Sequence, residues 1–199
     1  MSKIFLALLL LTLCLQACGK SSPTNYYALS SNINLQTQDR LPKTTLRLAR
    51  VAIPPYLDRE TIVTKKPDQV QLAVDSVQVW AEPLSDGVRR ILQNELAAPL
   101  LEHNITVLPL ASESSGTYTL LIDILRLDGQ LGSKVNLSAQ WSLVTSQANQ
   151  TLDDGIFSAE QVLTEGSYQE LVAAESILLQ NFAKHLLNRL PLAMRKGKN

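Results

Sequence analysis

The sequence predicts a single α/β (α+β) domain in which a mixed, largely antiparallel sheet packs against two amphipathic helices. Several short stretches alternate apolar and polar side chains or are rich in Val and Thr, as strands are. Two longer stretches repeat apolar residues with the helical period. The chain of 199 residues is 45% apolar and carries 18 basic and 18 acidic side chains. It can therefore bury a core, and its charge does not indicate a nucleic-acid partner.

The first residues have the layout of a secretory signal followed by a lipid attachment site. A basic start at Lys3 precedes an apolar run from Ile4 to Leu15, which is shorter than the roughly 20 residues that a membrane-spanning helix needs. The next residues, up to Cys18, resemble the lipobox of bacterial lipoproteins. This resemblance implies that residues 1–17 are removed and that Cys18 becomes an acylated N-terminus. The alternative is an ordinary signal with an incidental cysteine.

Two or three acyl chains on Cys18 would anchor the protein without spanning the membrane. Gly19 follows Cys18, and lipoproteins retained in the inner membrane resemble one another in having Asp there. Gly19 therefore favours an outer-membrane anchor facing the periplasm. Residues 18–25 are small and polar, so we expect a lipidated tether and, over 26–199, one periplasmic domain. With Cys14 as the only other cysteine, neither a disulfide framework nor a cysteine zinc site is predicted.

The first half of the domain is expected to form four strands and a helix. The strands span residues 26–29, 46–53, 60–66 and 69–80, and the second changes its phase at Ala49-Arg50, which indicates a bulge or burial on both faces. The helix spans 83–102, where the apolar stripe consists of Leu84, Val88, Ile91, Leu92 and Leu96. Pro83 suits the first helical turn, and Pro99 should end or kink the helix near its last turn.

The second half is expected to form a strand meander and a final helix. The strands span residues 105–108, 117–128, 135–143 and 155–163. The strand over 117–128 is apolar on both faces apart from Asp123, which predicts a central strand covered at least in part on two sides. The helix over 168–190 follows Gly166-Ser167, and its apolar stripe consists of Leu171, Val172, Leu178, Leu179, Phe182, Leu186 and Leu190.

No arrangement of residues in the sequence predicts catalysis, a metal site or a cofactor. His103 lies beside the expected end of the first helix and His185 on the far side of the last helix's stripe, and neither lies in a catalytic motif. Asp153 and Asp154 precede a strand and are expected to be solvated turn acids instead of a glycosidase pair. The covalent lipid on Cys18 is the one attached group that we expect.

Each helix places one carboxylate inside its apolar stripe. Glu95 falls there in the first helix and Glu175 in the last. Because a buried carboxylate needs a partner, we expect a structural pairing with a strand arginine, and the candidates are Arg47, Arg50 and Arg126. A functional acid is the alternative.

Five segments together resemble the ABC-type transport auxiliary lipoproteins of the paraquat-inducible PqiC type. They are Pro54-Pro-Tyr-Leu-Asp-Arg59, Ile62-Val63, Trp80-Ala-Glu-Pro-Leu84, Leu125-Arg-Leu-Asp-Gly129 and Ala139-Gln-Trp141. The similarity covers essentially the whole mature chain. It implies a non-enzymatic lipoprotein of the outer membrane that works with a membrane-anchored MCE-domain protein in moving lipids between the two membranes.

Within this resemblance, the loop 54–59 and the corner 80–84 are the candidate protein interface. Their residues are Pro54, Pro55, Tyr56, Leu57, Asp58, Arg59, Trp80, Pro83 and Leu84. The alternative is that they lock the domain internally. We also expect self-association, as a ring if the partner is a ring. The rival functions are a lipoprotein activator of a cell-wall synthase, which the short tether disfavours, and a secreted hydrolase.

Overall fold

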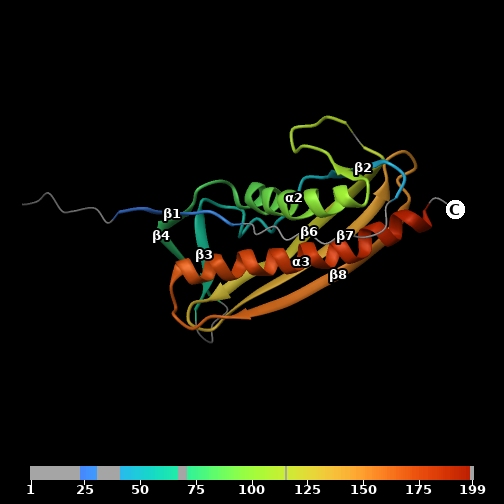
Figure 1. Cartoon of the computed structure of the whole chain (residues 1–199). Helices are drawn as coiled ribbons and strands as arrows, with labels where there is room; N and C mark the ends of the chain where they lie inside the picture. Colours follow the sequence, from blue (N-terminus) through green and yellow to red (C-terminus); the bar gives the residue numbers. More distant parts are fainter. Residues whose placement is uncertain (1–22, 31–40, 67–70, 115, 198–199) are drawn as a thin grey trace, which may run out of the picture.

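The computed structural model describes residues 23–30, 41–66, 71–114 and 116–197 (Figure 1). The predicted signal 1–17, Cys18 and most of the tether 18–25 lie outside the described residues. Within these ranges the chain forms eight strands and two helices: β1 (Asn25–Tyr27), β2 (Thr44–Leu48), β3 (Thr61–Lys65), β4 (Leu72–Trp80), α2 (Leu84–Glu102), β5 (Ile105–Val107), β6 (Tyr118–Gln130), β7 (Lys134–Thr145), β8 (Thr151–Val162) and α3 (Tyr168–Lys196).

The strands form one mixed sheet, as the sequence predicts. β6 pairs antiparallel with β7 along its whole length, and β7 pairs in the same way with β8. On the other side of β6, β2 pairs parallel with its first half, with Leu46 opposite Tyr118, and β3 pairs parallel with its end, at Thr64 opposite Gly129. β5 extends the sheet beyond β2, and β4 and β1 extend it beyond β3. The sheet is therefore divided on that side into two short arms.

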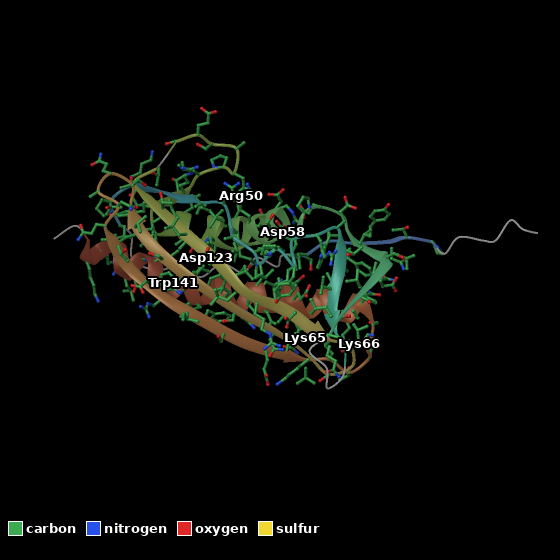
Figure 2. All side chains as sticks on the ribbon, turned by 180° about the vertical axis from the view of Figure 1, so that it is seen from behind. Arg50, Asp58, Lys65, Lys66, Asp123 and Trp141 are labelled. Carbon is green, nitrogen blue, oxygen red and sulfur yellow. The ribbon has the colours of Figure 1, made fainter. Side chains whose placement is uncertain are left out.

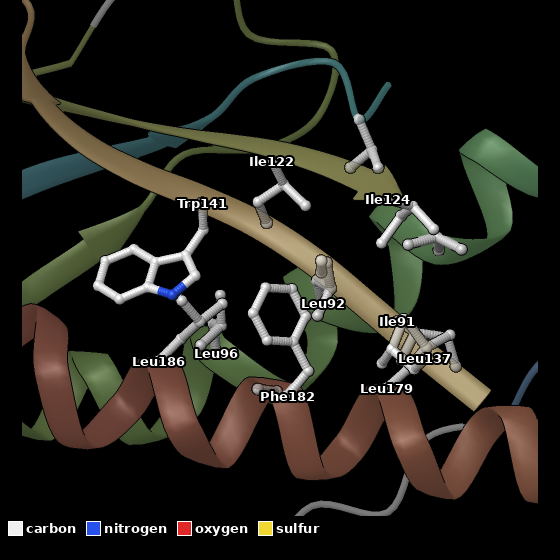
Figure 3. Close-up of a cluster of buried hydrophobic side chains, with 14 of the residues drawn as sticks. Ile91, Leu92, Leu96, Ile122, Ile124, Leu137, Trp141, Leu179, Phe182 and Leu186 are labelled. Atoms are coloured by element: carbon white, nitrogen blue, oxygen red, sulfur yellow. The ribbon is translucent and has the colours of Figure 1, made fainter. Parts of the chain in front are cut away.

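Both helices pack on one face of this sheet and contact each other across it (Figure 1). Every residue of the two predicted apolar stripes is buried. In Figure 3, Leu186 of α3 lies beside Trp141 of β7, and Leu179 of α3 lies beside Leu137 of β7. Full burial of a side chain of this size contributes about 1.5–3 kcal/mol, so the contact between helices and sheet is the main source of stability.

Both helices continue through a proline near their C-terminal end. The sequence predicts the first helix over 83–102, and α2 ends at Glu102 with Pro99 in its last turn. It predicts an end of the last helix at residue 190, but α3 passes Pro191 and ends at Lys196. A proline removes one helical hydrogen bond. In α3 the turn after the proline is stabilised instead by packing, because Met194 is buried.

The stretch from 46 to 53 is interrupted, as its change of phase predicts. β2 ends at Leu48, but the chain stays beside β6, where the Ala52 N–H donates to the Ile122 carbonyl oxygen at 3.0 Å. Ala52 forms an isolated parallel bridge with Asp123. The irregular segment between them keeps Val51 in the core.

The prediction that β6 is a central strand is confirmed, because strands pair with it on both sides, and it is covered on both faces only in part. Leu121 and Leu125 are 42% and 47% exposed, and Asp123 between them is also exposed. A register shift between Ile124 and Arg126 then reverses the alternation, which is why Leu127 is buried. The two helices cover one face of the sheet only. Figure 2 shows the molecule from behind, with Asp123 of β6 labelled.

Candidate functional site

The loop 54–59 and the corner 80–84 lie side by side at one end of the sheet. The Trp80 N–H donates to the Glu60 carbonyl oxygen at 2.8 Å, directly after the loop. The next N–H, of Ala81, donates to the Tyr27 carbonyl oxygen at 2.9 Å. The loop, the corner and β1 therefore meet at the point where the chain enters the domain.

The nine predicted interface residues divide into a buried and an accessible set. Leu57, Trp80 and Leu84 are only 2%, 9% and 3% exposed. The others are half-buried or exposed: Pro54, Pro55, Tyr56, Asp58, Arg59 and Pro83. The three buried side chains fill the core, as the alternative of an internal lock expects, so a partner could meet only the accessible set. The interface itself stays a prediction.

A groove of about 530 Å³ opens between these segments. Its lining comes from the start of the domain, the loop and the corner: Thr24, Tyr26, Asp58, Arg59, Glu60, Val79, Trp80, Ala81, Glu82 and Pro83. Tyr26 is 71% exposed and the edge of Trp80 forms part of the wall. Aromatic rings beside charged side chains suit an amphipathic protein segment.

The corner is held in place by Arg90 of α2. The Arg90 Nε donates to Glu82 Oε1 at 2.9 Å, and a second guanidinium nitrogen donates to the Leu29 carbonyl oxygen at 3.2 Å. One side chain thus ties the corner to the segment after β1. The groove walls are connected before any partner binds, which lowers the entropy that binding must remove.

A second group of polar residues surrounds Asp128, near the end of β6. Asp128 is 1% exposed and has three partners. Arg126 Nε donates to Oδ1 at 2.7 Å, the Lys65 ammonium lies 3.1 Å from Oδ2, and the Tyr56 hydroxyl donates to Oδ2 at 3.2 Å. Burial and the negative Asp128 raise the pKa of Tyr56. The cluster joins the loop and β3 to β6, so its role is to position the loop.

Glu175 is buried, as its place in the stripe predicts, but its expected arginine partner is absent. It is 2% exposed, and its Oε2 has no hydrogen-bond partner in the described part of the chain. Arg126 pairs with Asp128 instead. Burial and the charge of Asp128 raise the pKa of Glu175 to about 8. The side chain is therefore neutral at pH 7. Glu95 is also buried, at 7% exposure.

The sequence predicts that His185 lies on the far side of α3, away from the apolar stripe. In the structure its side chain packs against the sheet instead. Its ring centroid lies 5.8 Å from that of Trp141 and 5.5 Å from that of Phe157. Burial of the ring lowers the pKa of His185 most, and the positive charge of Arg189 lowers it further. Asp153 lies within β8 and not in a turn, and it accepts two hydrogen bonds from Arg189, at 2.9 and 2.6 Å. These contacts fasten α3 to the sheet.

Among the described residues, no group of three or more His, Cys, Asp or Glu side chains is placed to hold a metal ion. No helix in that part of the chain is long and apolar enough to cross a membrane.

The sequence did not identify the part of the groove that β1 provides. Thr24 and Tyr26 line the groove because β1 pairs parallel with β4, with Tyr26 opposite Val79. A pairing between strands about fifty residues apart leaves no local pattern. The one available signal is the pair of adjacent tyrosines directly after the tether.

Comparison with known proteins gives a family. The model of the ABC-type transport auxiliary lipoprotein component matches residues 27–186. No curated protein matches the chain.

Two solved structures have the same fold. Protein XCC0632 from Xanthomonas campestris superposes with a TM-score of 0.73 at 16% identity, and the match covers 88% of this chain and 99% of that protein. An uncharacterized protein superposes with a TM-score of 0.67 at 23% identity, with coverages of 85% and 99%.

Proposed function

Because the chain belongs to the family of ABC-type transport auxiliary lipoprotein components, we propose that it is a non-enzymatic part of an MCE-type intermembrane lipid transport system. It is anchored in the outer membrane by acyl chains on Cys18 and faces the periplasm. The family match, which covers most of the domain, is the observation that carries this proposal. Its role is to bind a membrane-anchored MCE-domain protein and to hold it close to the membrane.

The position of the groove supports a contact close to the membrane. Thr24 lines the groove and lies six residues after Cys18. At about 3.5 Å per extended residue, these six residues span at most about 21 Å. A partner that binds the groove is therefore held beside the outer membrane.

The chemistry of the groove supports a protein partner. Tyr26 is an exposed aromatic side chain in its lining, and Asp58 and Arg59 in the same lining offer both signs of charge. Tyrosine and arginine contribute disproportionately to binding at protein interfaces. If the partner is a ring, several copies of this lipoprotein bind around it and form a homo-oligomer of matching symmetry.

Site-specific photocrosslinking in cells tests the proposal. A photoreactive amino acid at Arg59 should capture the MCE-domain protein. The same group at Glu113, an exposed residue in a different loop, should not. Capture of a cell-wall synthase at Arg59 would establish the rival function, and equal capture of the MCE protein at both positions would rule out the groove as its binding site.

A further inference from the structure

β8 is a long edge strand whose outer side is uncovered in the described part of the chain. It spans twelve residues, contains no proline, and pairs with β7 alone. In Figure 1 it runs along the border of the sheet, below α3. Such an edge offers a row of backbone donors and acceptors to another strand.

One hydrogen bond at the end of β8 shows which of its backbone groups point away from β7. The Leu163 N–H donates to the Ser133 carbonyl oxygen at 2.7 Å and so points toward β7. Because neighbouring residues alternate, the outward groups belong to Ile156, Ser158, Glu160 and Val162. Among the described residues these four N–H groups have no partner.

The start of the edge is closed by a side chain. Asp153 Oδ1 accepts a hydrogen bond from the Asp154 N–H at 3.1 Å. The free edge therefore runs from 156 to 162. Glu160, on this edge, already has a counterion, because Lys134 lies 2.7 Å from it.

The exposed apolar residues of this edge are self-complementary. Ile156 and Val162 are 65% and 64% exposed, and they lie at equal distances in sequence from Ala159. If a second β8 pairs antiparallel about Ala159, each Ile156 meets a Val162 of the other copy, and each Ser158 meets a Glu160. Directly opposed β-branched side chains stabilise a strand pair.

Neighbouring registers lack this fit. A two-fold axis at residue 157 places Asp154 opposite Glu160, and an axis at 160 places Glu160 opposite itself, so like charges meet. An axis at 158 places Glu160 opposite Ile156. An axis at 156 leaves Val162 without a facing residue in the strand.

We propose that two copies of this chain pair through β8, antiparallel about Ala159, so that their sheets form one continuous sheet. Four facing pairs supply about eight backbone hydrogen bonds. The contact is the same on both copies and closes on itself. The two-fold axis is normal to the sheet, so both anchors lie at the same height and can share one membrane. The inference is independent of the transport partner.

Disulfide crosslinking of the full chain in membranes tests the register. In a pair about residue 159, two cysteines introduced by Ala159→Cys lie about 4.5 Å apart between Cα atoms, which a disulfide can bridge. The matched control is Gln161→Cys, on the same face of β8. Its two copies are separated by four residues along the strand, or about 13 Å. The wild-type chain controls for Cys14 and Cys18.

We expect an oxidised dimer from Ala159→Cys and none from Gln161→Cys. Equal crosslinking at both positions, or none at 159, would overturn the proposal. A second pair of variants avoids dependence on the cysteines. In light scattering of the detergent-solubilised protein, Ile156→Lys should weaken self-association at least about tenfold. Leu121→Lys, on the same face but two strands from the edge, should leave it unchanged. Equal effects of the two lysines would contradict pairing through β8.

Discussion

Glu175 carries a proton at neutral pH because folding removes its carboxyl group from water. Its pKa rises to about 8 through burial first and then through the charge of Asp128. In the unfolded chain the pKa of a glutamate is about 4.3. Between these two values the folded protein binds more protons than the unfolded chain. The free energy of unfolding must therefore fall as the pH rises from about 4.3 to about 8.

Glu175→Gln should remove this pH dependence. The amide resembles the neutral carboxyl group in shape and cannot ionise, so the variant should be more stable than the wild type at pH 8, by on the order of 3 to 5 kcal/mol. Urea titrations at pH 5, 6, 7 and 8 measure the difference. Glu113→Gln, at an exposed position, is the control and should follow the wild type. Parallel stability profiles for Glu175→Gln and the wild type would show that Glu175 is already ionised in the folded protein.

The burial of Glu175 could be predicted from the sequence, but its neighbour could not. Its angle on the helix places it among the apolar residues of α3, and the structure confirms this. Its surroundings depend on which strand lies opposite. Arg126 was a reasonable candidate, but Asp128, two residues later, pairs with it at 2.7 Å, and the two lie on the same strand. A local pairing of this kind competes with the long-range one.

The two helices show which elements a sequence specifies well. Their stripes repeat within a few residues, so the pattern is local and complete in the sequence. The face of β6 that carries Leu121 and Leu125 shows the opposite case. Apolar residues on both faces of a strand predict two covering layers. Whether the second layer exists depends on where the helices pack, and here α2 and α3 pack on the same face of the sheet. The groove was incompletely predicted for a similar reason, because β1 reaches it through a parallel pairing with β4.

Phe182→Ala should destabilise the domain by about 3 to 5 kcal/mol, because it leaves a cavity between α3 and the sheet. The Phe182 ring is fully buried and lies 5.2 Å from that of Phe157. Ile177→Ala on the same helix is the control, since Ile177 is 42% exposed and should cost less than about 1 kcal/mol. Denaturant titration of both variants gives the values. A loss below about 1 kcal/mol for Phe182→Ala would mean that this part of α3 does not form core.

At the scale of the whole molecule, the proposed lipid on Cys18 would place the domain at its membrane. Mass spectrometry of the membrane-purified protein should show that residues 1–17 are lost and that Cys18 carries acyl chains. Cys18→Ala should then leave the membrane or retain its signal, because the acyl chains are the anchor that we propose. Cys14→Ala, within the removed segment, should change neither property. An unmodified N-terminus at another residue would refute the lipid anchor.

The short pairing of β1 with β4 also determines how the domain responds to a pull. β1 is the strand nearest the predicted lipid anchor, and three residues, Asn25 to Tyr27, pair it with β4. Any force between the membrane and a bound partner is therefore applied first to this small contact. If β1 detaches, residues 25–27 extend the tether by about 10 Å, while Leu29 stays bound to Arg90 of α2. The same event removes Tyr26 from the groove wall, so that tension and partner binding oppose each other at one strand.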